Sequence, residues 1–280
     1  MIRSLSLLVL VAGWTPWSDR SRRGLGGLLL FPFGIALLLL SPADAIGQVT
    51  FSVNAVTDAS DANPGDGRAE TIAGDTTIRA AIEEANALAV AGTSGPFTIE
   101  LRSGVTYESD RVGSTWYGRS AWPPIAAEIV IEGRGATLRP AASATSRFRL
   151  AYVSGGATDH PPAGLLTLRE VNVVGFEARG GDGGDALRGG GGGGGGLGAG
   201  GAVFVQGTLI VERCAFLENT ARGGNGGTSG RLTNVFGGGG GGGGMGGAGG
   251  LGGFGGGGGG GFGGDGGDAA QAGLPADAGG

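Results

Sequence analysis

The residues best suited to chemistry lie in a short run of glycine and aspartate, Gly-Gly-Asp-Gly-Gly-Asp-Ala-Leu-Arg, at 180–188. The run matches the nonapeptide G-G-x-G-x-D-x-U-x, in which glycines let backbone carbonyls converge and an aspartate supplies a hard oxygen ligand for calcium. Asp182 and Asp185 are therefore candidate calcium ligands. Each ion in such sites lies between successive tandem turns, whereas the related copies in this chain begin only at 223 and 263. A flexible loop without metal is the alternative.

A second acidic group follows the first predicted strand, where Asp58, Asp61, Asn63 and Asp66 fall within nine residues. Oxygen side chains at this density suggest calcium as well, but Gly65 occupies the place where an EF-hand loop needs its third oxygen ligand, and no glutamate closes the loop. Aspartate and asparagine also stabilise turns by bonding to the backbone two residues ahead. A turn built on such bonds is the favoured interpretation.

Composition removes several reaction classes. All 19 basic residues are arginine, so no lysine is present to form a Schiff base or to act as a proton carrier. The lone Cys214 has no disulfide partner in the chain and is predicted to pack as a small apolar residue, and the lone His160 rules out a multi-histidine zinc site. Glu83 and Glu84 are adjacent on a predicted helix, about 100° apart, so we expect both to be solvated rather than to form an acid/base pair. We predict no catalytic residue, no bound cofactor and a protein that is not an enzyme.

Four aromatic residues, Tyr107, Trp116, Tyr117 and Trp122, lie close together in the sequence around a segment that ends in Pro123-Pro124. Exposed rings of this kind can stack on sugars, and the same rings can pack over a hydrophobic core. Packing is the favoured prediction.

The first 45 residues have the pattern of a cleaved secretory signal peptide. Arg20, Arg22 and Arg23 precede an apolar run from Leu25 to Leu40, and Ala43-Asp44-Ala45 is an A-x-A cleavage signal. The apolar run is shorter than the roughly 20 residues that span a bilayer, so we expect contact with the membrane only during export. Without the leader the net charge is about −7. This acidic balance excludes nucleic acid as a partner, because phosphate binding needs clustered basic residues.

The mature chain divides by pattern into three parts: an N-terminal region at 46–95, a β-rich body at 96–236 and a glycine-rich tail at 237–280. In the first part, apolar residues at helical spacing predict one amphipathic helix over 76–88 with Asp75 as its N-cap. Short alternating segments predict strands in the body. There, residues 165–184 align without a gap on 208–227, at an offset of 43.

This repeat determines the predicted fold. A fixed period is typical of stacked repeat architectures, and the strand at 200–205 between the two copies suggests that one period holds two coils of about 21 residues. We therefore predict an all-β chain with a short right-handed parallel β-helix, a solenoid whose N-terminal end is capped by the helix at 76–88. Cys214 would then stack near Val171 inside the coils.

Glycine dominates the C-terminal third: 49 of the 69 glycines lie between 180 and 280, in unbroken runs at 189–196, 237–244 and 255–261. Such segments have few side chains to offset the entropy lost on ordering. We expect a flexible loop at 180–201 and a disordered tail at 237–280.

Several motifs resemble those of a known family. The segment D-A-N-P-G-D-G at 61–67 with T-I-R-A-A-I-E-E-A-N at 77–86 resembles the CSLREA domain, although the cysteine of that motif is Asp75 or Thr76 here. The repeats at 165–227, with G-G-A-V-F-V at 200–205 and F-L-E-N-T-A at 216–221, are similar to polymorphic outer-membrane-protein β-helix repeats. The resemblance implies a bacterial surface protein of adhesin type, with no established catalytic residues.

The sequence favours a secreted or cell-surface protein, associated with the bacterial outer membrane, that has a structural or adhesive role. Its expected partner is a surface ligand, either a polysaccharide or a host or cell-surface protein, and the chain is expected to be a monomer. One alternative is a polysaccharide lyase or hydrolase on a β-helix, motivated by analogy of fold alone. The other is a glycine-rich component of an extracellular matrix or cell wall.

Overall fold

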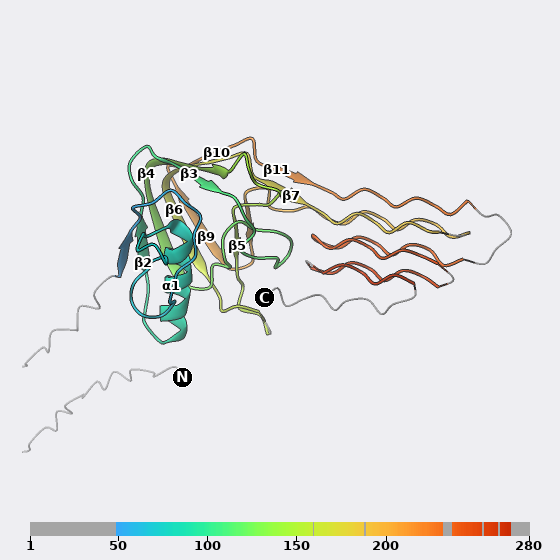
Figure 1. The fold of residues 1–280 in the computed structure, drawn as a ribbon, viewed down its shortest axis with the longest axis horizontal. Helices are drawn as coiled ribbons and strands as arrows, with labels where there is room; N and C mark the ends of the chain where they lie inside the picture. The colour runs from blue at the N-terminus through green and yellow to red at the C-terminus, as the bar shows by residue number, and fades with distance from the viewer. Residues whose placement is uncertain are drawn as a thin grey trace, which may run out of the picture. The chain divides into compact units, whose positions relative to one another are not determined.

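The computed structural model describes residues 49–158, 160–187, 189–231, 237–253, 255–262 and 264–269, and the leader predicted at 1–45 lies outside them. The described residues contain one helix and eleven short strands, and most of the strands belong to one sheet (Figure 1). The strands are β1 (Thr50–Ser52), β2 (Phe97–Glu100), β3 (Thr106–Ser109), β4 (Glu128–Pro140), β5 (Ala151–Val153), β6 (Leu165–Val174), β7 (Glu177–Arg179), β8 (Val203–Val205), β9 (Thr208–Glu212), β10 (Ala215–Leu217) and β11 (Thr220–Arg222).

The main sheet has seven strands in the order β1-β2-β4-β6-β10, with β3 also paired to β4 and β9 also paired to β6. Every pairing between its strands is parallel. Two smaller parallel sheets join β5 to β8 and β7 to β11. Parallel pairing requires a long connection between partners, and here those connections carry the helix, the loops and the glycine-rich segments.

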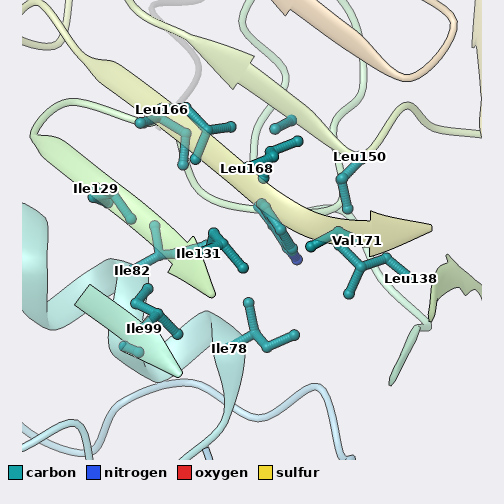
Figure 2. Close-up of a cluster of buried hydrophobic side chains, with 14 of the residues drawn as sticks. Ile78, Ile82, Ile99, Ile129, Ile131, Leu138, Leu150, Leu166, Leu168 and Val171 are labelled. Atoms are coloured by element: carbon teal, nitrogen blue, oxygen red, sulfur yellow. The ribbon is translucent and has the colours of Figure 1, made fainter. Parts of the chain in front are cut away.

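The buried side of the main sheet forms the core, because residues in register place like side chains above one another. Ile99, Ile131 and Leu168 occupy successive strands in register, and all three are fully buried (Figure 2). Strand alternation sends every second residue to this side, as period two in the sequence predicts. Fully burying side chains of this size contributes roughly 1.5–3 kcal/mol each.

Helix α1 (Ile78–Val90) contributes Ile78 and Ile82 to the same buried cluster. It begins and ends two residues later than the sequence pattern predicts. Its N-cap is Thr77 rather than Asp75, because the Thr77 side chain accepts the N–H of Ala80 at 3.0 Å, as capping hydroxyls do.

The predicted fold class is wrong. The described residues form a parallel-sheet core of α/β type with one short helix and no solenoid, so they do not contain the expected β-helix with a capping helix. The error lies in the division of the 43-residue period. Leu166 pairs directly with Leu209, so the 43 residues of one period form a single connection from one strand to its neighbour in the sheet. The segment at 203–205 pairs with β5 in a separate sheet. Neighbouring strands are also unevenly spaced, since Arg169 bonds to Glu132 across 37 residues and to Glu212 across 43.

The expectation of a flexible loop and a disordered tail is also wrong for the described residues. Segments 180–187, 189–200 and 223–230, with the described residues of 237–269, form a set of extended chains that we call the glycine array (Figure 1). Backbone bonds between its segments recur at every third residue, such as those from Gly181 to Gly244 and from Gly184 to Gly241. This repeat matches the three-residue turn of a polyproline II helix.

Glycine is required in the array because its segments approach one another through their backbones. A Cβ on Gly184 would lie 1.9 Å from the carbonyl oxygen of Gly250, whereas a Cβ on Gly194 would have no atom within 4 Å. Positions such as Gly194, where a Cβ would meet nothing, face outward and can hold a side chain. Hydrogen bonds from one backbone to the next therefore provide the order that side-chain packing provides elsewhere.

Candidate functional site: an arginine-lined cleft

The two aspartates predicted to bind calcium lie on neighbouring outward positions of the array. Asp182 Oδ1 accepts the backbone N–H of Asn225 at 2.7 Å, and Asp185 Oδ1 accepts that of Thr228 at 2.6 Å. These hydrogen bonds to the backbone are the main reason that the pKa of each aspartate lies below its ordinary value.

No three side chains of His, Cys, Asp or Glu lie close enough to hold a metal ion in the described part of the chain. Asp182 and Asp185 thus act as acceptors for the neighbouring segment in this structure, and calcium binding by them stays a prediction. Asp265 and Asp268 make the same contact with the N–H groups of Ala248 and Leu251, at 2.7 and 2.8 Å.

Asp182 also lies in a cleft of about 400 Å³ where the array meets the sheet core. Three arginines line this cleft: Arg119 from the connection between β3 and β4, Arg147 from the connection between β4 and β5, and Arg179 at the end of β7. We call it the arginine cleft. The remaining lining residues are Thr145, Ser146, Gly180, Gly181, Asp182, Gly246, Ala248 and Asp265.

The three arginines differ in how far their charge is already paired. Arg179 donates to both oxygens of Asp182, at 3.0 and 2.9 Å. Arg147 is largely exposed and lies 3.8 Å from Glu177, a loose ion pair. Arg119 is exposed and has no ion pair or side-chain hydrogen bond to any other residue that the structure describes. Arg119 and Arg147 therefore retain donors for a ligand.

A second cleft of about 350 Å³ adjoins the first and shares Ser146 and Arg147 with it. Arg139 lines the second cleft but not the first, and its Nε lies 2.8 Å from Oε1 of Glu108. Arg147 thus borders both clefts, which suits an extended ligand better than a small one.

A buried cation supports the loop that carries Arg119. Arg149 is only 1% exposed, donates from Nη2 to the carbonyl oxygen of Tyr117 at 2.5 Å, and lies 5.2 Å above the ring of Phe204. Its Nε and Nη1 have no hydrogen-bond partner among the residues that the structure describes. Burial lowers the pKa of Arg149 to about 10. The neighbouring Gly118 has a φ of 99° and leaves no room for a Cβ, which would meet Arg149 Nη2 at 2.7 Å.

The four aromatic residues of the sequence prediction do not form one group. Tyr107 and Trp122 belong to the buried cluster of the core. Trp116 and Tyr117 contact His160 instead, with ring centroids 4.5 and 5.6 Å away, and the Tyr117 hydroxyl lies 2.9 Å from His160 Nε2.

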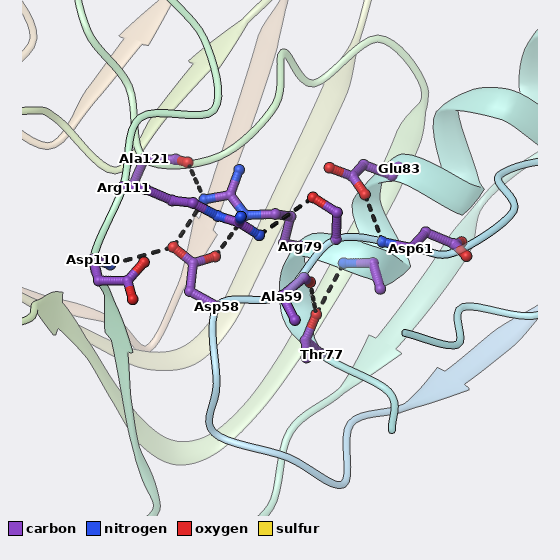
Figure 3. Close-up of polar contacts among 11 residues, drawn as sticks. Asp58, Ala59, Asp61, Thr77, Arg79, Glu83, Asp110, Arg111 and Ala121 are labelled. Carbon is purple, nitrogen blue, oxygen red and sulfur yellow. Dashed lines mark hydrogen bonds and ion pairs between the residues drawn. The ribbon is translucent and has the colours of Figure 1, made fainter. Parts of the chain in front are cut away.

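The acidic residues after β1 stabilise the local fold. Asp58 forms a buried ion pair with Arg79, whose Nε lies 2.6 Å from Oδ1 (Figure 3). Asp61 Oδ1 accepts the N–H of Asn63 and Asp66 Oδ1 accepts that of Arg68, two turns of the predicted kind. Burial is the main reason that the pKa of Asp61 is raised.

The prediction that both helix glutamates are solvated is wrong for Glu84, which is fully buried. Its carboxylate accepts the N–H groups of Gly65 and Gly67 and so fixes the loop against α1. Glu83 is half-buried and accepts the N–H of Asp61 at 2.7 Å (Figure 3).

Cys214 is half-buried against the core, and its Sγ lies 3.3 Å from the carbonyl oxygen of Leu168. Sequence reasoning did not identify the three cleft arginines, because they come from separate connections and share no motif. The one weak signal is Ala-Arg-Gly-Gly, which occurs at 178–181 and again at 221–224.

Comparisons with protein-family models, with curated proteins and with solved structures give no match for this chain. No helix in the described ranges has the length and apolar character needed to cross a membrane.

Proposed function

We propose that this chain is an exported, non-enzymatic protein with a structural and adhesive role, and that it holds an acidic polysaccharide in the arginine cleft. The A-x-A pattern of the first 45 residues supports export to the cell surface or beyond. The cleft supplies the adhesive part of the proposal and the glycine array the structural part.

One observation carries the choice of ligand: three arginines line one cleft, and Arg119 has no partner among the described residues. A guanidinium presents its donors in a planar fork that matches the two oxygens of a carboxylate. Arg119 and Arg147 bring two guanidinium groups with unused donors to one cleft, and their positive charge favours an anionic ligand over a neutral one.

The other residues of the cleft favour a sugar chain over a denser polyanion. Asp182 and Asp265 would repel closely spaced phosphates, while they can accept hydrogen bonds from hydroxyl groups. Thr145 and Ser146 offer hydroxyls that both donate and accept. A polymer with one carboxylate per sugar and many hydroxyls fits this mixture, and the adjoining cleft beyond Arg147 gives it a path.

The array suits a structural role because its order comes from backbone hydrogen bonds that bind segments far apart in sequence. Gly181 bonds to Gly244 and Gly249 bonds to Asp182, so the C-terminal segments are tied to the segment that follows β7. The same ties hold Gly246, Ala248 and Asp265 on the wall of the arginine cleft.

The localisation experiment uses intact bacterial cells that produce the full chain or a variant without residues 1–45. Surface labelling followed by retention on immobilised polygalacturonate is expected for the full chain, and both signals are expected to be lost without the leader. A full chain that stays inside the cell would overturn the proposed location. A labelled chain with equal retention on polygalacturonate and on neutral dextran would overturn the proposed ligand.

A further inference from the structure

The last strands of the main sheet leave part of the hydrophobic core uncovered. Val211 in β9 pairs with Leu168, and Phe216 in β10 pairs with Val173. Leu168 and Val173 are 0% exposed, whereas Val211 is 44% and Phe216 is 40% exposed. Side chains that the pleat directs into the core thus reach solvent at this edge.

The same edge also leaves backbone groups without a strand partner in the described part of the chain. β9 and β10 pair with β6 on one side, and no other described strand pairs with them. An apolar edge of this kind is a template for another strand, and soluble proteins normally cover or charge it.

The charges on the outer face indicate what fits the edge. Across successive strands, Glu132, Arg169 and Glu212 alternate in sign, with Arg169 2.7 Å from Glu132 and 2.9 Å from Glu212. A second row has Arg213 at 3.0 Å from Glu170. The first row ends in a negative charge and the second in a positive one.

We infer that a second copy of this chain pairs antiparallel with the edge β9–β10, about a two-fold axis between Glu212 and Arg213. Arg213 of the second copy then follows Glu212 in the first row, and Glu212 of the second copy follows Arg213 in the second row. Both rows continue with alternating sign, and like charges directly opposite one another are avoided.

The same two-fold axis also brings side chains from the same side of the sheet together. Pairing about this axis places Leu209 opposite Phe216 of the second copy and Val211 opposite Cys214 of the second copy. Leu209, Val211 and Phe216 are in register with the buried Leu166, Leu168 and Val173, and Cys214 packs against the core. All four side chains therefore lie on the core side of the sheet, so core residues meet core residues. Arg213 has a φ of 52° and marks the bend between β9 and β10. Because the axis passes through this bend, both copies bend together.

Such an isologous interface needs only one surface, used twice, which is the commonest route to a dimer. It replaces the monomer expected from the sequence. It also places two arginine clefts on one particle, which strengthens attachment to a polymer without any new contact.

Light scattering on the full chain measures the mass of the particle in solution. The chain has a mass of 27.2 kDa, and the dimer has twice that value. Glu212→Arg and Arg213→Glu each place like charges opposite one another in the homodimer, so each variant alone is expected at the mass of one chain. Mixed in equal amounts, the two variants have opposite charges at both positions and are expected to recover the doubled mass.

Two further arms separate loss of pairing from loss of folding. Glu70→Arg and Arg68→Glu make the same charge changes at an exposed pair and should leave the doubled mass intact. Under oxidation, Val211→Cys should give a cross-linked dimer through Cys214 of the second copy, whereas Ile210→Cys on the outer face should not. A wild-type chain that remains at one chain mass, single variants that stay dimeric, or a mixture that fails to recover the dimer would overturn the inference.

Discussion

Asp185 Oδ1 accepts the backbone N–H of Thr228 across 43 residues of sequence, at 2.6 Å. The carboxylate thereby replaces a carbonyl oxygen as the acceptor between two segments of the glycine array. This contact explains why the pKa of Asp185 lies below the ordinary value of 3.8.

The array should therefore loosen in acid. A carboxyl group whose pKa is lower in the folded state stabilises the fold above its unfolded pKa, and this contribution is lost as the pH falls below 3.8 through the folded value. Amide exchange at Thr228 should accelerate in that range beyond its intrinsic pH dependence. Asp185→Asn keeps an oxygen acceptor, so the Thr228 amide in this variant should show no extra pH dependence. In Asp185→Ala the acceptor is lost, and the Thr228 amide should exchange rapidly at neutral pH too. Equal protection of Thr228 in the wild type and Asp185→Ala would refute the role of this carboxylate.

Alanine substitutions at interior and at outward glycines of the array should have opposite effects on stability. In Gly184→Ala the new methyl group meets the carbonyl of Gly250, so the array must shift, at a cost of about 1–3 kcal/mol in the free energy of unfolding. Gly194→Ala has open space and reduces the entropy of the unfolded chain, so it should be neutral or stabilise by about 0.5 kcal/mol. Denaturant unfolding of both variants makes the comparison, and an equal effect of the two changes would show that the array is not close-packed.

Glu84 should contribute more to stability than an exposed glutamate outside the helix. Glu84→Ala removes the acceptor for Gly65 and Gly67, and we expect the free energy of unfolding to fall by about 2 kcal/mol. Glu70→Ala is the control, since Glu70 is exposed at 4.0 Å from Arg68, and it should change stability by less than about 0.5 kcal/mol. Thermal unfolding that ranks the two variants equally would contradict the role of the buried carboxylate.

Local patterns in the sequence predicted local structure because they depend on neighbouring residues. Phe97, Ile99 and Leu101 alternate with other residues, as do Ile129 and Ile131, and these two short runs lie in or next to β2 and in β4. Helical spacing predicted α1 to within two residues. The 43-residue repeat has the register that the alignment gives, with Leu166 opposite Leu209. The repeat could not show whether one period holds one coil or two, because that depends on contacts between segments distant in sequence.

The order of the glycine array was missed because glycine content was interpreted as entropy alone. A signal was present in the spacing of the other residues. Met245, Ala248 and Leu251 lie three apart, as do Phe262, Asp265 and Asp268. Side chains tolerated only at every third position indicate a chain with three residues per turn. The burial of Glu84 was missed because its partners, Gly65 and Gly67, are nearly 20 residues away.

The most direct test of the proposed function is a calorimetric titration of polygalacturonate into the full chain and into Arg119→Gln/Arg147→Gln. Arg68→Gln/Arg111→Gln, which removes two exposed arginines outside the cleft, is the matched control. The wild type and the control should bind with equal affinity that weakens with salt, and the cleft variant should bind about tenfold more weakly, because charged hydrogen bonds are lost. Equal affinity of the cleft variant and the wild type, or no binding of polygalacturonate by the wild type, would contradict an arginine cleft that holds an acidic polysaccharide.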